Sequence, residues 1–306
     1  MRAALSWADT AELLPRRSRS SKACAPVGGR LTSVFERCGQ RVSVSAQQAL
    51  HCHLQDPAQS DHLTIVLVSP RNPLNIGATA RAMANFGFGR MAVVAPFAPH
   101  WREARSAIGA PQLLLHAAEC ATLAEAVADS TLVVGTATLA RRRPEQPAVS
   151  LPALAPVLQN EIARGGRAAL VFGPEKRGLS REDLSRCHVL VEIPTSPEQP
   201  SMNLGQAVAV CLYELGARAV DSGRSTTGAP APMTPKARDQ AVSSATLDLL
   251  AEEIGHAMEA AEYSPSEMCA ANQHDMRLLL RRLALSERDA RRVLGLFRRI
   301  AWRLKR

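Results

Sequence analysis

Three short polar segments contain the side chains best suited to bind and orient a ligand. The first runs from Asn75 to Arg81 and places an amide and a guanidinium among small residues, which allow a large ligand to approach closely. The second contains Glu175 in a glycine-rich loop, and the third contains Ser201 and Asn203. Amide, hydroxyl, carboxylate and guanidinium groups together supply the donors and acceptors that hold a polar substrate. The sequence therefore places its candidate catalytic or binding groups in these three segments.

Each segment also has a purely structural interpretation. Asn75 is a suitable helix cap, and Ser180 with Asp183 is typical of an N-terminal capping pair. Asn203 and Gln206 fit the same pattern at the start of the last helix of this region. The glycine-rich loop matches neither a Walker A loop nor a dinucleotide fingerprint, which argues against a nucleotide-dependent oxidoreductase.

Alternating strand and helix patterns surround the three segments. Short apolar runs predict buried parallel strands at Leu63–Val68, Met91–Ala95, Thr131–Val134, Ala168–Phe172 and His188–Ile193. Helical patterns predict Asn75–Phe86, Leu123–Ala128 and Asn203–Val220, with helix and loop over Trp101–Leu115. This alternation predicts an α/β domain with a mainly parallel sheet. Ligands of such sheets bind outside the carboxyl ends of the strands, where we expect the polar segments to lie.

Positive charge is concentrated at the end of the chain. The whole chain has a net charge of +9 and an isoelectric point of about 9.7. Between Met276 and Arg306, eleven Arg and Lys residues stand against two acidic residues, so this segment alone carries +9. A basic surface of this kind suits a polyanion, and nucleic acid is the first expectation. The alternative is a solvated arginine-rich helix without a partner.

Composition divides the 306 residues into four parts. Residues 1–61 are basic, poor in acids and without sustained periodicity, so we expect a disordered extension or a misassigned start. An organellar targeting segment is the less favoured alternative. Residues 62–220 form the α/β domain, residues 221–236 a linker rich in Ser, Thr, Gly and Pro, and residues 237–306 a basic helical domain.

The helical domain is expected to contain three helices. Spacing predicts helices over Ala245–Glu262 and Asn272–Leu285, and a third that begins at Ser286 with Asp289 as its capping partner. The apolar stripe expected on the third helix consists of Val293, Phe297, Ile300 and Leu304. The arginines expected on another face are Arg288, Arg292, Arg299 and Arg303.

Cysteine spacing and hydropathy exclude other classes of protein. The seven Cys residues form no CxxC pair and are odd in number, so neither a disulfide framework nor a zinc site is expected. Residues His51 to His53 lack a second cluster of ligands, and we expect no metal. No apolar run approaches the ~18 residues of a membrane span. These features are typical of a protein of the reducing cytoplasm that binds no membrane.

Taken together, the order and spacing of the three segments resemble the SPOUT methyltransferases of the SpoU branch. Asn75–Arg81 resembles motif 1 (N-x-G-A-x-x-R), Phe172–Ser180 resembles motif 2, and Ser201–Glu214 resembles motif 3. The resemblance covers roughly residues 62–220. Within the branch, the helical extension after a linker is similar to that of the tRNA 2′-O-methyltransferases of the anticodon loop. The strand end at Gly135–Thr138, followed by arginines, is similar as well.

The resemblance implies a fold, a cofactor and an assembly. Members of the family fold as a parallel α/β sheet with a C-terminal trefoil knot, and the knot binds S-adenosyl-L-methionine. They work as homodimers whose active sites are completed across the interface. The implied cofactor-binding residues are Thr136, Ala137, Thr138, Gly173, Ile193, Ser201, Met202 and Leu204. The arginines expected to bind RNA are Arg141, Arg142, Arg288, Arg292, Arg299 and Arg303.

The implied reaction is methylation of an RNA ribose at its 2′-hydroxyl, without a metal. The implied catalytic residues are Arg81, Asn75, Glu175, Ser201 and Asn203. Because a guanidinium is effectively never deprotonated in proteins, we expect Arg81 to hold a phosphate and stabilise the oxyanion rather than to act as a base. The expected target is a cytidine or uridine at position 32 of the tRNA anticodon loop. The alternatives are ribosomal RNA as the substrate and a non-catalytic RNA-binding protein with the same fold.

Overall fold

The structure is a computed structural model that describes residues 61–139, 144–222, 241–263 and 265–304. The predicted N-terminal extension, apart from Asp61, lies outside the described residues, and so does most of the predicted linker. Arg141 and Arg142, two of the arginines expected to bind RNA, also lie outside them.

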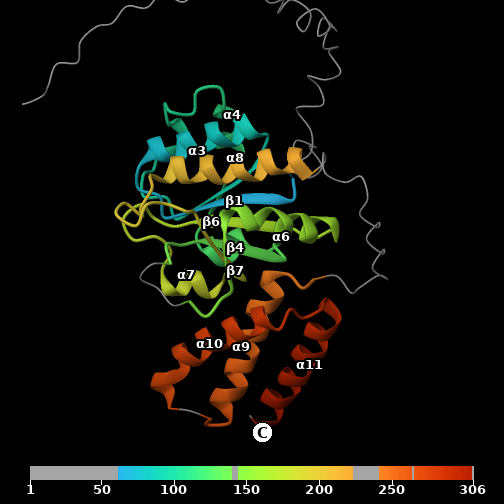
Figure 1. Ribbon diagram of the computed structural model, residues 1–306. Helices are drawn as coiled ribbons and strands as arrows, with labels where there is room; N and C mark the ends of the chain where they lie inside the picture. The colour runs from blue at the N-terminus through green and yellow to red at the C-terminus, as the bar shows by residue number, and fades with distance from the viewer. Residues whose placement is uncertain (1–60, 140–143, 223–240, 264, 305–306) are drawn as a thin grey trace, which may run out of the picture. The chain divides into compact units, whose positions relative to one another are not determined.

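A seven-stranded sheet forms the centre of the α/β domain (Figure 1). Its strands are β1 (Leu63–Val68), β2 (Arg90–Val94), β3 (Ala118–Cys120), β4 (Leu132–Thr136), β5 (Ala148–Ser150), β6 (Ala168–Phe172) and β7 (Val189–Glu192). The strand order is β3-β2-β1-β6-β4-β7-β5, and every neighbouring pair is parallel. The predicted α/β class with a mainly parallel sheet is confirmed, whereas the trefoil knot stays a prediction.

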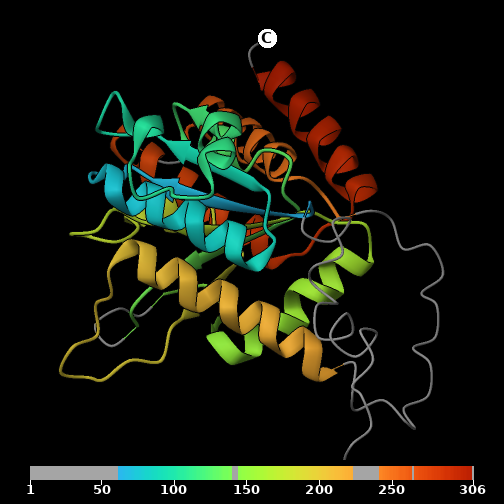
Figure 2. The same ribbon diagram turned by 90° about the horizontal axis from the view of Figure 1, so that it is seen from above.

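Helices cover both faces of this sheet. They are α3 (Pro73–Phe86), α4 (Pro111–His116), α5 (Leu123–Ala126), α6 (Leu151–Ala163), α7 (Arg181–Ser185) and α8 (Leu204–Ser222), with a 3-10 turn, η2 (Trp101–Glu103). Side chains of α3, α6 and α8 pack on one face, and side chains of α5 and α7 pack on the other. α3 and α8 lie side by side (Figures 1 and 2).

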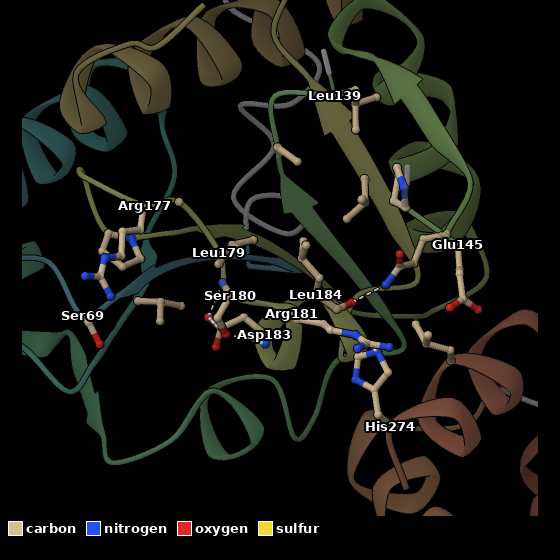
Figure 3. Close-up of a pocket in the computed structure, with 18 residues that line it drawn as sticks. Ser69, Leu139, Glu145, Arg177, Leu179, Ser180, Arg181, Asp183, Leu184 and His274 are labelled. Atoms are coloured by element: carbon tan, nitrogen blue, oxygen red, sulfur yellow. Dashed lines mark hydrogen bonds between the residues drawn. The ribbon is translucent and has the colours of Figure 1, made fainter. Parts of the chain in front are cut away.

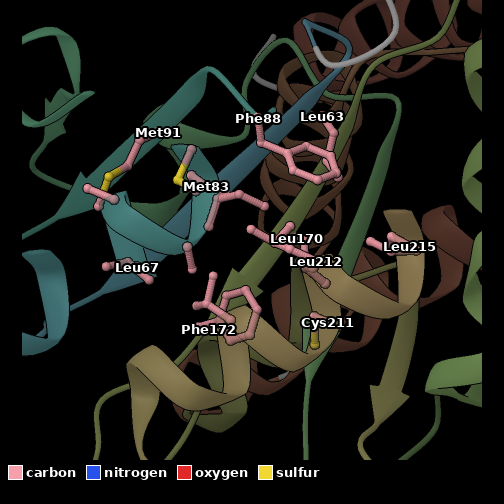
Figure 4. Packing of buried hydrophobic residues seen from close by; sticks show 14 of the residues in the cluster. Leu63, Leu67, Met83, Phe88, Met91, Leu170, Phe172, Cys211, Leu212 and Leu215 are labelled. Atoms are coloured by element: carbon pink, nitrogen blue, oxygen red, sulfur yellow. The ribbon is translucent and has the colours of Figure 1, made fainter. Parts of the chain in front are cut away.

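The strands are buried on both faces, because successive residues of a strand point to opposite sides. In β1, Leu67 joins the cluster beneath α3 and α8, whereas Val66 joins the cluster beneath α5 and α7. Figure 4 shows the first cluster, in which Leu170 and Phe172 of β6 lie near Leu212 of α8. Burial on both faces explains why the sequence predicts these strands as continuous apolar runs.

The sequence patterns missed β3, β5 and α6. The two strands contain three residues each and lie at the edges of the sheet, so they are too short to show a period. α6 has one Pro in its first turn and a second, Pro156, inside the helix, and an internal Pro normally ends a helix. Leu154 and Leu158 of α6 are nevertheless buried against the sheet. Tertiary packing therefore stabilises a helix that its local sequence disfavours.

The C-terminal region forms three helices around a small core of its own. They are α9 (Ser244–Ala260), α10 (Cys269–Arg282) and α11 (Glu287–Leu304), with a 3-10 turn, η3 (Ser266–Met268). The hydroxyl of Ser286 accepts a hydrogen bond of 3.1 Å from the backbone N–H of Asp289. The predicted cap at the start of the last helix is therefore confirmed.

α11 packs on α9 through a stripe that differs from the predicted one. Its inward residues are Ala290, Val293, Leu294, Phe297 and Ala301. Ile300 and Leu304, which were expected in this stripe, are 37% and 45% exposed. The small side chains of Ala290 and Ala301 are buried, so the contact follows them and leaves the larger residues at its edge. The prediction of Val293 and Phe297 is confirmed, and that of Ile300 and Leu304 is wrong.

Paired charges join the C-terminal helices to the end of α7. The carboxylate of Asp248 in α9 accepts hydrogen bonds from Arg186, at 2.5 Å, and from Arg281 of α10, at 2.8 Å. The side chain of Arg281 is 1% exposed and also donates to the backbone carbonyl of Arg186 at 3.0 Å. A buried charge is tolerated only when it is paired and hydrogen-bonded. Asp248 pairs with both arginines, and Arg186 has a second carboxylate partner in Glu182, at 3.3 Å.

The described residues bear on three features considered in the sequence: membrane spans, metal ligands and disulfides. None of their helices combines the length and the apolar content that a membrane crossing needs. The same residues contain no group of three or more His, Cys, Asp or Glu side chains that could hold a metal ion. The described cysteines Cys120, Cys187, Cys211 and Cys269 are all free thiols.

We expect Asp248→Ala to destabilise the protein by about 3 kcal/mol or more, because it leaves two largely buried arginines without their carboxylate. Urea denaturation measures this loss. The control is Asp129→Ala, which removes a carboxylate 3.5 Å from Arg167 at the surface, where the side chain of Asp129 is 78% exposed. The control is expected to cost less than about 1 kcal/mol. Equal losses in the two variants would contradict a structural role for the buried charges.

Candidate active site

One chain of hydrogen bonds joins the three polar segments. The side-chain N–H of Asn75 donates to Glu175 Oε1 at 2.9 Å, and the side-chain N–H of Asn203 donates to Asn75 Oδ1 at 2.9 Å. Asn75 lies between the other two residues and is 8% exposed. Residues from α3, from the loop after β6 and from the start of α8 therefore meet at the carboxyl end of the sheet, as the sequence predicts.

Glu175 also receives hydrogen bonds from the backbone at the start of α3. Its two carboxylate oxygens accept from the N–H groups of Arg71 and Asn72, each at 3.2 Å. Partial burial alone would raise the pKa of Glu175, but the hydrogen bonds from Asn75 and from these backbone groups outweigh it. The pKa of Glu175 is consequently lowered from its ordinary value of 4.5. Glu175 is therefore an ionised acceptor in this arrangement.

The expectation that Asn75 caps a helix is wrong. α3 begins earlier, at Pro73, and its N-cap is Asn72, whose side chain accepts from the backbone N–H of Leu74 at 3.0 Å. Asn75 instead lies inside the first turn, and its amide is free to join the other two segments. The Asn72-Pro73 pair carries the missed signal, because Asn is a preferred cap and Pro is preferred at the first helical position.

Asn203 combines a structural role with its place in the chain of hydrogen bonds. Its side-chain oxygen accepts from the backbone N–H groups of Gly205, at 3.0 Å, and Gln206, at 3.3 Å, in the first turn of α8. A Cβ added at Gly205 would lie 2.8 Å from the Cβ of Ala78 in α3. Gly205 therefore allows the start of α8 to approach α3, and this contact keeps the amide of Asn203 within reach of Asn75.

A cavity of about 290 Å³ lies beside these hydrogen bonds. All eight residues expected to bind the cofactor line it: Thr136, Ala137, Thr138, Gly173, Ile193, Ser201, Met202 and Leu204. Glu175 lines it as well, together with Lys176, Arg177 and Thr195, which the sequence did not single out. The structure thus brings the strand end after β4, the loop after β6 and the segment before α8 around one space.

The loop after β6 folds tightly back on itself. A Cβ at Gly173 would collide with the backbone of Gly178 and Leu179, and Gly178 adopts a positive φ of 62°. Both glycines are therefore required by the backbone conformation. Ser180 and Asp183 form the predicted capping box at the start of α7, which fixes the far end of the loop.

A larger hollow, of about 830 Å³, lies on the other side of this loop (Figure 3). It extends from Ser69 to α10, where Arg181 donates a hydrogen bond of 3.1 Å to His274 Nε2. It shares five lining residues with the candidate active-site cavity, which are Ala137, Pro174, Arg177, Gly178 and Leu179. The loop after β6 is thus a wall between two open spaces.

The arginines expected at the site lie outside the cavity. Arg81 is exposed on α3 and does not line it. The arginines of α11, which are Arg288, Arg292, Arg299 and Arg303, are all exposed. Arg292 lies 3.6 Å from Asp289, and the guanidinium of Arg299 lies 4.6 Å from the centre of the Trp302 ring. Within one described copy, the structure therefore brings together Asn75, Glu175, Ser201 and Asn203, but not Arg81.

Comparison with known proteins shows the family of this chain. The model of the SpoU rRNA Methylase family matches residues 62–213. A protein of Escherichia coli K12 described as an uncharacterized tRNA/rRNA methyltransferase, LasT, is 35% identical over 195 residues, which is 63% of this chain and 84% of that protein. The chain belongs to the SpoU methylase family. The resemblance predicted from the three segments is confirmed, and all three lie inside the matched residues.

Two further relatives of this SpoU methylase carry the name TrmJ. The tRNA (cytidine/uridine/adenosine-2′-O-)-methyltransferase TrmJ of Pseudomonas aeruginosa is 39% identical over 156 residues. The match spans 51% of this chain and 60% of the length of that relative. The crystal structure of TrmJ from Z. mobilis ZM4 superposes with a TM-score of 0.64 at 27% identity, covering 78% of this chain and 98% of that one.

We expect Glu175→Gln to destabilise the protein by about 1–3 kcal/mol near neutral pH, because a neutral amide replaces an ionised acceptor of three N–H groups. A group with a lowered pKa stabilises the folded protein above its unfolded pKa, and this contribution disappears as the pH falls through the folded value. The stability difference between wild type and variant should therefore shrink well below pH 4.5, the ordinary pKa.

Urea denaturation of both proteins across the acid range measures this difference. Comparing two proteins at each pH removes the titration of all other groups. Glu252→Gln is the control, because Glu252 is an exposed carboxylate on α9 and lies outside the hydrogen-bonded chain. A difference for Glu175→Gln that stays constant down to strongly acidic pH would show that the carboxylate charge is not what holds the three segments.

Proposed function

We propose that the chain transfers a methyl group from S-adenosyl-L-methionine to a ribose 2′-hydroxyl of RNA. The observation that carries the proposal is the chain from Glu175 through Asn75 to Asn203 at the edge of a cavity lined by all the expected cofactor-binding residues. The names of the TrmJ relatives support tRNA as the substrate. The expected target is a cytidine or uridine at position 32 of the anticodon loop.

The cavity suits a nucleoside-like ligand. Its volume of about 290 Å³ is close to that of the smallest ligand pockets. Ile193, Met202 and Leu204 offer apolar surface for a purine ring, and the segment Thr136–Thr138 offers backbone and hydroxyl groups at a strand end. When bound, S-adenosyl-L-methionine supplies a methyl group that its sulfonium has already activated. No further activation of the donor is required from the protein.

The protein must still orient the 2′-hydroxyl and stabilise the negative charge that develops on its oxygen. The 2′-oxygen bonds to the methyl carbon as the carbon–sulfur bond breaks, and the hydroxyl proton passes to a phosphate oxygen or water. Ser201 lines the cavity and Asn203 is held in place by Asn75, so both can hydrogen-bond to the target ribose. Glu175 fixes the orientation of the Asn75 amide. Arg81, a permanent cation, holds the neighbouring phosphate and stabilises the oxyanion.

The position of Arg81 supports a homodimer. Arg81 is exposed on α3, away from the cavity of its own chain. α3 and the adjacent α8 expose the apolar side chains of Leu74 (55%), Val210 (38%) and Tyr213 (60%). Exposed apolar side chains on two adjacent helices suit an interface with another protein. We propose that a second copy covers this surface and that the active site is completed across it by Arg81.

RNA binding by the C-terminal helices is part of the same proposal. The four arginines of α11 named above are exposed and so can reach phosphates, whereas the opposite side of α11 packs on α9. Arg141 and Arg142 lie outside the described residues and remain predicted RNA contacts. A tRNA substrate and the free thiols fit the cytoplasm as the site of action.

The direct test uses purified protein, labelled S-adenosyl-L-methionine and tRNA transcripts without modifications, followed by mass spectrometry of the nucleosides. We expect a 2′-O-methylated cytidine or uridine in the anticodon loop. Methylation of ribosomal RNA fragments but not of tRNA would move the substrate to the ribosome. The absence of transfer to either RNA, despite tight binding, would contradict the reaction and favour a non-catalytic RNA-binding protein.

Arg81→Ala separates the two roles in the same assay. Loss of a group that stabilises an oxyanion is expected to lower kcat by about 100-fold or more. RNA affinity, measured by filter binding, should fall only a few-fold, since one phosphate contact of many is lost. Arg164→Ala is the matched control, because Arg164 is an exposed arginine at the end of α6. Unchanged turnover in Arg81→Ala would remove Arg81 from the mechanism.

A further inference from the structure

A third hollow, of about 420 Å³, adjoins the candidate active site. It is formed by the turns that follow β1 and β2 together with the loop after β6. Pro174, Lys176 and Arg177 line both this hollow and the active-site cavity. A ligand that extends out of the active site across this loop can therefore reach the third hollow.

An aromatic ring stands at the edge of this hollow. Phe97 is 74% exposed, although burial of a Phe side chain is strongly favourable. The guanidinium of Arg71 lies over the ring, 5.4 Å from its centre. An exposed ring beside a cation is a suitable surface for a nucleobase, since every base has a face that stacks on an aromatic side chain.

The backbone that carries these two side chains is strained and tightly held. Ser69 and Ala95, which line the hollow, have positive φ angles of 45° and 42° although neither is Gly. The N–H of each bonds to a neighbouring strand end, and the N–H of Phe97 donates to the carbonyl of Pro70 at 3.2 Å. Strain of this kind persists only where the surrounding structure imposes it, and it is concentrated at functional sites.

The charge of the hollow suits a nucleic acid backbone. Arg71, Lys176 and Arg177 line it, and the described residues around it include no acid. The nearest carboxylate in sequence, Glu175, has its oxygens occupied by the N–H groups of Arg71, Asn72 and Asn75. The hollow therefore combines net positive charge with a surface for stacking, which is the combination that binds unpaired RNA.

We propose that this hollow holds the nucleotide adjacent to the methylated one, with its base stacked on Phe97 and its phosphate among the three cations. The inference rests on the proposed function, because it takes the neighbouring cavity as the site of methyl transfer. Phe97 is then a positioning residue: it holds the strand so that the target ribose enters the active site. It contacts neither the cofactor nor the reacting atoms.

The test uses anticodon stem-loop RNAs in which 2-aminopurine replaces, one at a time, each loop base near the methylated nucleotide. Stacking quenches the fluorescence of this base. With the full-length wild-type chain, we expect quenching at one of the two flanking positions. Phe97→Ala should abolish it, and Phe97→Trp should retain it. Quenching that is identical in wild type and Phe97→Ala at both flanking positions would overturn the proposal.

Kinetics provide the second readout. Phe97→Ala is expected to raise the KM for RNA about tenfold, as the loss of one stacked base does, with little change in kcat at saturating RNA. Arg71→Gln should raise the KM for RNA by a smaller factor. This substitution keeps the backbone N–H of residue 71, which bonds to Glu175. The affinity for S-adenosyl-L-methionine should not change. The control is Tyr263→Ala, which removes another exposed ring, in the segment after α9, that is 72% accessible.

The two proposals fail in different ways. If wild type methylates RNA but Phe97→Ala matches it in KM and fluorescence, the stacking site is wrong and the proposed function stands. If wild type transfers no methyl group yet shows quenching that depends on Phe97, the proposed reaction is wrong and the RNA site stands. Phe97→Ala and Arg71→Gln both change exposed side chains, and thermal denaturation checks that the variants fold.

Discussion

The structure depends on the ionised carboxylate of Glu175, which receives N–H groups from two other segments. It accepts from Asn75 and from the backbone at the start of α3, and Asn75 in turn holds Asn203 at the start of α8. These residues are about 100 positions or more apart in sequence. The parallel sheet brings their strand ends together, and Gly205 lets the two helices approach. The hydrogen bonds therefore convert a common sheet architecture into one defined site.

Other features of the molecule become understandable from this site. The loop after β6 carries Glu175, lines the candidate active-site cavity and borders two further hollows, so its tight glycine-dependent conformation affects all three. α7 follows the same loop and is joined to the C-terminal helices by Asp248 and two arginines. The proposed RNA-binding helix, which packs on α9, is thus connected to the proposed catalytic loop through α9 and α7. Arg81 remains outward on α3, where the proposed second copy would need it.

The sequence predicted the sheet, the family and many of the residues that line the cavity, but not how the side chains pair. Buried strands such as β1 and β6 are apolar on both faces, and that pattern is visible without a structure. α6 was missed because its prolines argue against a helix and only packing stabilises it. The role of Asn75 was missed because it depends on partners 100 and 128 residues away. The contact between α11 and α9 follows two small alanines, which a search for large apolar residues does not detect.

The most direct test of this account is a double-mutant cycle between Asn75 and Asn203, with kcat/KM for methyl transfer as the measured quantity. We expect the amides of Asn75 and Asn203 to act through the one hydrogen bond that joins them. Asn75→Ala, Asn203→Ala and the double variant should then lose similar amounts of activity, with a coupling energy of about 1 kcal/mol or more. Strictly additive losses would show that the two residues act independently, and the hydrogen-bonded chain would not be the organising feature of the site.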